Sequence, residues 1–265
     1  MSGTVLPSPP IPSTLVVMPS PALDAWVERF WVVSGNRDAD FELLPDGVAD
    51  LVVLFAGSRV DVQWYGTATG ARAVPLVQGG HYVGIRFRPG RQRHLLRADA
   101  REITDRRLPA EAGCAALFEA LAEALLTGRV RAAPEAALAR QFAKATPADE
   151  RFDRALDELG PAAVPMSVEA AARTAGLSLR QFERRCLHDV GVSPRTFAAM
   201  CRFRRAAEAL RSAVSPGLAD LAADCGYADQ SHMTRAFRLW AGRPPGAFRA
   251  GSGASVPMSH PFKTR

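Results

Sequence analysis

The chain has 265 residues, of which 48% are hydrophobic, and a net charge of +6 at pH 7. This length fits one large domain or two medium ones. The sequence contains no run of about 18 apolar residues, which is the length needed for a transmembrane helix. The charge is uneven, because residues 165–250 hold 13 Arg, no Lys and 7 Asp or Glu, so that 13 − 7 = +6. The rest of the chain is neutral, which favours a polyanionic partner for the basic segment alone.

The chain begins with a segment rich in Pro and Ser, residues 1–20, that has no charged region before an apolar core. We expect a disordered lead-in rather than a signal peptide. The cysteines form no C-x-x-C pair and have no histidine at metal-ligand spacing. We therefore expect buried free thiols, no metal or cofactor, and a reducing cytoplasm. They are Cys114, Cys186, Cys201 and Cys225.

Residues 21–108 have the pattern of short strands. Residues 50–55 form a β-rich apolar run, and residues 81–88 alternate, with Val83, Ile85 and Phe87 on one face. Gly and Pro separate these runs, which is typical of a small antiparallel barrel or sandwich. Residues 22–31 fit either a helix or an edge strand.

The period changes to that of helices after residue 108. Residues 109–148 predict two helices, near 113–125 and 134–142, that form a bridge between two parts of the chain. This bridge either packs within the chain or dimerises. Residues 150–252 read as helical throughout, with Ser167, Ser178 and Ser193 at helix N-caps. Residues 253–265 are expected to be a flexible tail.

The helical region repeats itself at an interval of about fifty residues, and each copy reads as a helix-turn-helix, near residues 167–190 and 218–241. The offset is 50 before the turn and 51 after it, so the second copy has one extra residue at its turn. The glycines can adopt φ > 0 in the tight turn, and the alanines allow close packing of the two helices. Ala172, Gly176, Arg184, Gly191, Pro194 and Phe197 recur as Ala222, Gly226, Arg235, Gly242, Pro245 and Phe248.

The second helix of each copy has one apolar and one polar face. Phe182 with Leu187, and Met233 with Phe237, are expected to be buried. The opposite face suits base edges, because Arg pairs with guanine, Gln with adenine, and Glu accepts from cytosine. Helix N-termini near Ser178, Ser193 and Arg195 are candidates for phosphate contacts. The predicted base-reading residues are Arg180, Glu183, Arg184, Gln230, Ser231, Thr234 and Arg235.

Some of these residues have plausible partners within the chain. Arg235 could instead pair with Asp224 or Asp229, and Glu183 with Arg180 or Arg184. A helix over residues 193–211 spans about 28 Å. It could therefore hold two recognition helices roughly one turn of DNA, ~34 Å, apart, so that one chain reads two successive major grooves.

Residues 165–250 resemble the DNA-binding domain of the AraC family of bacterial transcription regulators. The resemblance implies seven helices and base contacts from both recognition faces. Cys186 and Met233 depart from the family's aromatic core. The matching residues of the second unit are Arg202, Phe203, Ala206, Leu210, Leu218, Leu221, Ala222, Gly226, Tyr227, Ser231, Arg235, Ala236, Phe237, Gly242, Pro244, Pro245, Phe248 and Arg249; those of the first unit are Ala172, Ser178, Arg184, Gly191, Ser193, Pro194 and Phe197.

The segments 44–47, 84–90 and 102–107 resemble the N-terminal domain of an uncharacterised AraC-like subgroup. Family members often have an effector-binding, cupin-like β-barrel in this place. His81 and His94 form no H-x-H pair of the kind expected in a metal-dependent cupin. If an apolar or anionic effector binds, the candidate pocket residues are Trp31, Trp64, Tyr82 and Arg86, which fit the core equally well.

The chain is therefore expected to be a non-enzymatic, cytoplasmic regulator that binds operator DNA. A small effector or homodimerisation would modulate it, and RNA polymerase is a possible partner. The alternatives are a helical interaction scaffold without DNA binding and, least favoured, a DNA-repair alkyl-transfer protein. The last would need an activated cysteine, and none of the four has suitable neighbours.

Overall fold

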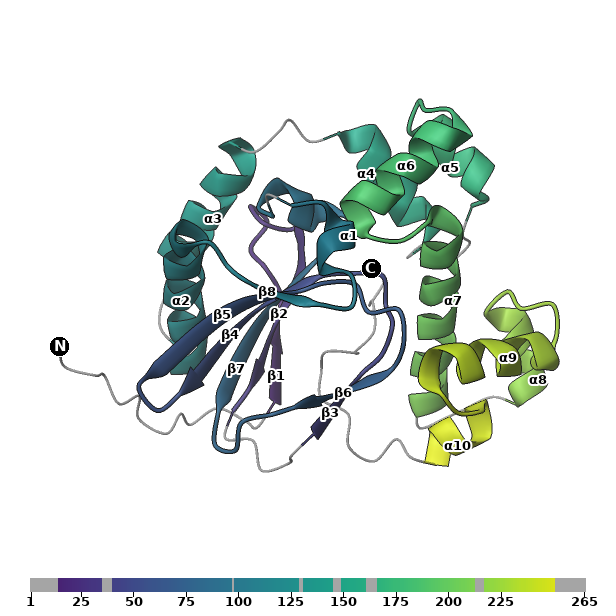
Figure 1. The fold of residues 1–265 in the computed structure, drawn as a ribbon, viewed down its shortest axis with the longest axis horizontal. Coiled ribbons are helices and arrows are strands. Elements are labelled where there is room, and N and C mark those ends of the chain that lie inside the picture. Colours follow the sequence, from purple (N-terminus) through teal and green to yellow (C-terminus); the bar gives the residue numbers. More distant parts are fainter. Residues whose placement is uncertain are drawn as a thin grey trace.

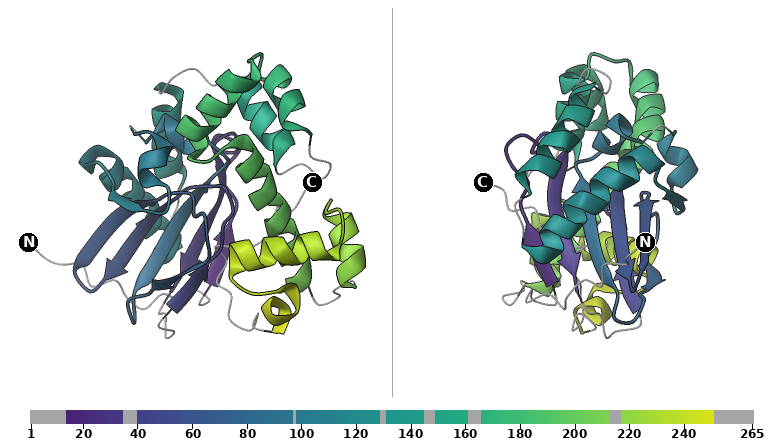
Figure 2. Two further views of the ribbon diagram at one scale, coloured as in Figure 1. Left: turned by 45° about the vertical axis from the view of Figure 1, so that its right-hand side comes forward. Right: turned by 90° about the vertical axis from the view of Figure 1, so that its left-hand side faces the viewer.

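The computed structural model describes residues 14–34, 40–96, 98–128, 131–144, 149–160, 166–212 and 217–250. Strands come first along the chain and helices follow, as the change of hydrophobic period predicts. In space, two helices cover one side of the β-sheet and the C-terminal helices lie on the other side (Figure 1). Two further views show the same three layers (Figure 2).

The N-terminal part is mainly antiparallel sheet. Six strands pair in the order β1-β2-β7-β4-β5-β8, and β3 pairs only with β6. The described ladders give an open sheet, so the mainly-β class is confirmed and a closed, cupin-like barrel is not. The strands are β1 (Thr14–Val17), β2 (Val27–Val33), β3 (Asp40–Leu43), β4 (Asp50–Ala56), β5 (Arg59–Tyr65), β6 (Arg72–Pro75), β7 (His81–Phe87) and β8 (Arg107–Pro109).

Two expectations about the beginning of the chain need correction. Residues 14–17 were expected in the disordered lead-in, but they form β1, which pairs with β2. Residues 1–13 lie outside the described residues. Residues 22–31, which fitted a helix or an edge strand, form turns up to Trp26 and then the start of β2. Strand β2 is not an edge strand, because it pairs with β1 on one side and with β7, which is distant in the sequence, on the other.

The larger sheet is buried on both faces. Val83, Ile85 and Phe87 of β7 lie in one apolar cluster with α2 (Ala112–Thr127) and α3 (Ala132–Lys144). Trp26 stacks on Phe142 of α3, with ring centroids 5.0 Å apart. The bridge helices therefore pack within the chain, against the sheet.

The C-terminal part contains seven helices within the described residues. They are α4 (Glu150–Leu159), α5 (Val168–Thr174), α6 (Leu179–Val190), α7 (Pro194–Arg211), α8 (Leu218–Asp224), α9 (Gln230–Ala241) and α10 (Pro245–Ala250). The predicted caps are confirmed, since Ser167, Ser178 and Ser193 each accept a hydrogen bond from a backbone N–H in the first turn. Within the described part of the chain, no helix combines the length and apolar composition needed to cross a membrane.

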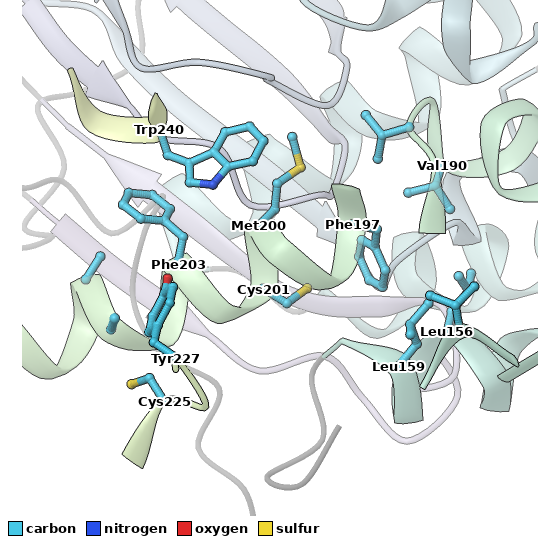
Figure 3. Packing of buried hydrophobic residues seen from close by; sticks show 14 of the residues in the cluster. Leu156, Leu159, Val190, Phe197, Met200, Cys201, Phe203, Cys225, Tyr227 and Trp240 are labelled. Atoms are coloured by element: carbon cyan, nitrogen blue, oxygen red, sulfur yellow. The ribbon is translucent and has the colours of Figure 1, made fainter. Parts of the chain in front are cut away.

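One apolar core joins both helix-turn-helix copies across α7 (Figure 3). Phe197, Met200 and Phe203 of α7 are fully buried. The ring of Phe203 packs edge-on against Phe237 of α9, with centroids 5.0 Å apart. Helix α7 is thus the shared support on which both copies are mounted.

The N-terminal part also touches the helical part directly, through η1 (Arg91–His94) and α1 (Ala100–Ile103). The Gln92 side chain donates a hydrogen bond to the carbonyl of Asp189 at 2.6 Å. The Thr67 hydroxyl donates to the carbonyl of Val190 at 2.8 Å. The end of α6 is therefore fixed to the N-terminal part.

Candidate nucleic-acid interface

Both helix-turn-helix copies have the same turn. Gly176 and Gly226 have φ of +68° and +75°, a region that side chains with Cβ rarely adopt. The residue after each glycine donates its N–H to the buried alanine of the first helix, with Leu177 to Ala172 at 3.0 Å and Tyr227 to Ala222 at 2.8 Å. These turns hold α6 across α5 and α9 across α8, as the duplication predicts.

The recognition helices α6 and α9 start and end with local capping interactions. Ser178 and Gln181 form a capping box at the start of α6. Asp229 caps α9 by accepting from the N–H of His232 at 2.6 Å. Both helices end at left-handed glycines, Gly191 and Gly242. Capping requires no contact with the rest of the fold, which is why these boundaries were predictable.

The buried faces of the recognition helices agree with expectation at three positions of four. Phe182, Met233 and Phe237 are 0% exposed. Leu187 is only half-buried, and Cys186 occupies the buried position instead. Since Phe182 and Cys186 are four residues apart, they share one side of α6, whereas Leu187 is turned away from it.

The predicted base-reading side chains lie on the outer surface. Arg180 and Arg184 are exposed on α6, with Glu183 half-buried beside them. On α9 the exposed residues are Gln230, Ser231 and Arg235, and Thr234 is half-buried. The Thr234 hydroxyl donates to the carbonyl of Gln230 at 2.9 Å, so its oxygen remains an acceptor for DNA.

The alternative ion pairs of these residues do not form. Among the described residues, no salt bridge joins Arg235 to Asp224 or Asp229, nor Glu183 to Arg180 or Arg184. The guanidinium groups of Arg184 and Arg235 thus have no competing carboxylate within the described fold. Their donors are available to a base or a phosphate.

The predicted phosphate-contact residues lie at two helix N-termini. The Ser178 hydroxyl interacts with Gln181, and the Ser193 hydroxyl accepts from the N–H of Thr196 at 3.1 Å. Both hydroxyls are therefore occupied by capping, while Arg195 is exposed in the first turn of α7. Any phosphate contact at these sites would come from Arg195 and from first-turn N–H groups rather than from the serine side chains.

Three of the four cysteines are buried, as expected, whereas Cys114 is half-buried. Burial raises the pKa of Cys186 and of Cys201 to about 12, and it also raises the pKa of Cys225. Thiolate formation near neutral pH is therefore opposed at these three residues, and alkyl transfer depends on a thiolate.

The four candidate effector residues do not lie together. Trp31 and Tyr82 belong to one apolar cluster of the sheet, and Trp64 to the cluster on the opposite face. Arg86 is 0% exposed and pairs with Asp46 at 2.7 Å and Asp50 at 2.8 Å. The structure therefore gives no single pocket formed by all four.

The pairing of Arg86 also explains the role of Trp31. The indole N–H of Trp31 donates to the Asp50 carboxylate at 3.1 Å, and the ring covers Gly84, where a Cβ would come within 1.7 Å of it. Both carboxylates that neutralise Arg86 come from the loop and strand 36–40 residues before it, a pairing that alternation alone does not reveal.

Sequence reasoning also missed the contacts that hold the recognition helices to the N-terminal part. In addition to those at α6, the carbonyl of Trp240 in α9 accepts from the N–H of Ala71 at 3.0 Å. Arg243 pairs with Glu42 of β3 at 2.7 Å. These partners are separated by more than 90 positions along the chain, and no local pattern marks them.

In comparisons with known proteins, different family models match the N-terminal part and the C-terminal part of the chain. A family model described as "Helix-turn-helix domain" matches residues 171–251. A second, described as "Domain of unknown function (DUF6597)", matches residues 15–109. No curated protein matches the chain.

Several solved structures are similar to the chain. A transcriptional regulator with an AraC-type DNA-binding domain from Chromobacterium violaceum is 23% identical, with 39% of this chain and 93% of that one covered and a TM-score of 0.36. The DNA-binding domain of AdpA, solved with a target DNA, is 28% identical over 38% of this chain and 87% of that one, with a TM-score of 0.33. ToxT from Vibrio cholerae strain SCE256, solved with an unsaturated fatty acid bound, is 11% identical over 85% and 97%, with a TM-score of 0.43.

Proposed function

Because residues 171–251 form an AraC-type helix-turn-helix domain, we propose that this protein is a sequence-specific transcription regulator in which α6 and α9 of one chain enter successive major grooves of DNA. The observation that carries the proposal is the pair of outward polar faces, one on each recognition helix, where Arg184 and Arg235 form no salt bridge with any residue that the structure describes. The proposed base-reading residues are Arg180, Glu183, Arg184, Gln230, Ser231, Thr234 and Arg235.

The support for two grooves is the length of the connecting helix. Helix α7 has 18 residues, which corresponds to about 27 Å at 1.5 Å per residue. The packing of both copies on α7 adds the width of a helix to this span. Successive major grooves are ~34 Å apart on one face of the duplex, so the two helices can face them without a second chain.

The N-terminal part acts on DNA binding through its contacts with both recognition helices. It holds α6 through Thr67 and Gln92, and the end of α9 through Ala71 and Glu42. A change in that part which shifts one contact and not the other alters the relative placement of the two helices. A coupling free energy of roughly 1–3 kcal/mol changes affinity about 5- to 150-fold.

The proposal also includes a division of the chain, further partners and a location. The division into a sensing region at 21–108, a helical bridge at 109–148 and a DNA-binding region at 150–252 follows the change from strands to helices. A homodimer, contact with RNA polymerase and a cytoplasmic location are expected of such a regulator. No catalytic step is included.

The full-length chain tests the proposal against random-sequence duplex DNA. Binding through arginine–phosphate contacts releases counterions, so log K falls linearly with log salt, with a slope of about −0.9 for each neutralised phosphate. The expected slope corresponds to several contacts and becomes shallower in Arg195→Ala. Affinity that does not change with salt, or no binding at the lowest salt, would reject the proposal.

A further inference from the structure

A cleft of about 560 Å³ opens between the first recognition helix and the N-terminal part of the chain, beside the contacts that fix the end of α6. Side chains of α6 form one wall, and η1 and α1 form the other. This volume is within the range of small-molecule sites, roughly 300–1,000 Å³. The cleft lies outside the sheet, so it is separate from the buried pair of Arg86 with its carboxylates.

The lining of the cleft includes four arginines and one carboxylate. Carboxylates next to the lining also pair with three of these arginines: Asp153 with Arg93, Asp149 with Arg185 and Asp99 with Arg101. The carboxylate, Asp189, already has three cationic or imidazole neighbours, Arg93 at 3.6 Å, Arg185 at 3.2 Å and His188 at 2.6 Å. It has no capacity left to neutralise Arg101 and Arg184.

The two remaining arginines are the ones that can receive an anion. Arg184 is exposed and has no salt bridge among the described residues. Arg101 is 61% exposed. Its Nε and Nη2 donate to the Asp99 carboxylate of its own helix cap, and no hydrogen bond from its Nη1 occurs among the described residues. The two arginines come from opposite walls of the cleft, so that each wall contributes a cationic side chain to the space between them.

A buried polar atom on the wall also lacks a partner. His94 is 8% exposed, and its Nε2 has no hydrogen-bond partner. Burial lowers the pKa of His94 to about 4, so the ring is neutral near pH 7 and one nitrogen can act as donor or acceptor.

The cleft overlaps with the proposed DNA face at one residue. On α6 the cleft is lined by Gln181, Arg184, Arg185 and His188, a stripe with helical spacing. The proposed DNA face uses Arg180, Glu183 and Arg184. Only Arg184 belongs to both, so a ligand in the cleft and a base in the groove compete for one guanidinium.

We propose that this cleft binds a phosphate group between Arg101 and Arg184, and that its occupancy controls whether Arg184 reads DNA. A phosphate group suits guanidinium groups from two walls better than a carboxylate ligand does, because it has more acceptor oxygens. The phosphate can come from a small phosphorylated molecule or from the DNA backbone. The control of Arg184 rests on the proposed function, whereas the phosphate site itself does not.

The first experiment titrates the full-length protein with inorganic pyrophosphate at constant ionic strength, followed by the arginine Nε–Hε signals in NMR spectra. Arg101→Ala and Arg184→Ala should each weaken binding about tenfold, the loss of one charge-assisted hydrogen bond. Arg180→Ala, on α6 but outside the cleft, and Arg59→Ala, in the β4–β5 hairpin, should leave it unchanged. Equal affinities in all four variants would overturn the proposal.

The second experiment separates the two sources of phosphate. If a small molecule is the occupant, pyrophosphate weakens DNA binding of the natural chain. Arg101→Ala then raises the pyrophosphate concentration needed for this inhibition about tenfold and leaves DNA affinity unchanged. If the DNA backbone is the occupant, Arg101→Ala weakens binding to all sequences and reduces the salt slope by about 1. A protein that binds pyrophosphate at the cleft but no DNA would reject the proposed function and keep the phosphate site.

Discussion

The two helix-turn-helix copies share a backbone plan but differ in what they present and in what holds them. The face of α6 is charged, with two arginines and a glutamate, whereas the face of α9 carries Gln230, Ser231 and Thr234 beside a single arginine. The end of α6 is fixed to the N-terminal part by buried hydrogen bonds. The end of α9 is held by one backbone hydrogen bond and an ion pair whose two side chains are 32% and 35% exposed.

This difference suggests a division of roles. Exposed ion pairs contribute little to stability, while a buried carbonyl that loses its donor is costly. The first copy should therefore respond more strongly than the second to changes in the N-terminal part. The two copies thus have the same backbone arrangement but different contacts with the N-terminal part.

The largest expected difference is in the free energy of unfolding, between substitutions at the two glycines that end the recognition helices. Both have left-handed φ, which costs a residue with Cβ roughly 1–2 kcal/mol. At Gly191 a Cβ would also come within 2.3 Å of the Thr104 hydroxyl, whereas at Gly242 it would meet nothing within 4 Å. Gly191→Ala should thus lower the free energy of unfolding by about 2–4 kcal/mol, and Gly242→Ala by about 1–2 kcal/mol. Equal losses in urea unfolding would show that α6 is not docked as described.

The next effect compares the equivalent arginines of the two faces. Arg235→Ala should cost about 1–3 kcal/mol of DNA affinity and relax preference at one base pair. Arg184→Ala should do the same in the other half of the site. Arg59→Ala, remote from both helices, serves as the control in the same binding titration. A uniform loss on all sequences would identify either residue as a phosphate contact instead.

The two N-caps should differ by less. Ser178→Ala removes the two hydrogen bonds of the hydroxyl, which accepts from the N–H of Gln181 and donates to its side chain. Asp229→Ala removes one. Each loss is expected to be about 1 kcal/mol, with Ser178 the larger. Thermal unfolding measures both, with Ser231→Ala on the exposed first turn of α9 as a control. The comparison fails if Asp229→Ala is the more damaging of the two.

The smallest effect concerns the ion pair that holds the second copy. Glu42→Gln should change the free energy of unfolding by roughly 0–1 kcal/mol, because Glu42 and Arg243 are only half-buried. The difference from the natural chain should vanish near 1 M salt, where the Debye length is about 3 Å. A loss that persists at high salt would mean that this contact is stronger than its exposure implies.

The sequence predicted the features that depend on neighbouring residues. Ser178, Gly176 and Gly191 act through hydrogen bonds and backbone angles within a few positions, so helix boundaries and both turns could be recognised without the fold. The outward placement of Arg184 and Arg235 followed from helical spacing in the same way.

Features that depend on distant residues were not predictable. Alternation placed Arg86 on the correct face of β7, but only the fold brings Asp46 and Asp50 to it. Likewise, two tryptophans that looked equivalent lie on opposite faces. The strand register places Trp31 beside Gly84 of β7 and Trp64 in line with the next residue, Ile85, and successive residues of a strand point to opposite faces. The cleft beside α6 combines side chains about 90 positions apart along the chain, so neither segment alone predicts its arginine-rich lining.

The most direct test of the central claim is an unbiased selection of duplex DNA by the full-length protein, repeated with Arg184→Ala and Arg235→Ala. If each recognition helix reads its own groove, the natural chain selects two short boxes with centres about 10 base pairs apart. Each variant then loses preference within one box and keeps the other. A single box, or the same box lost in both variants, would contradict bipartite reading by one chain.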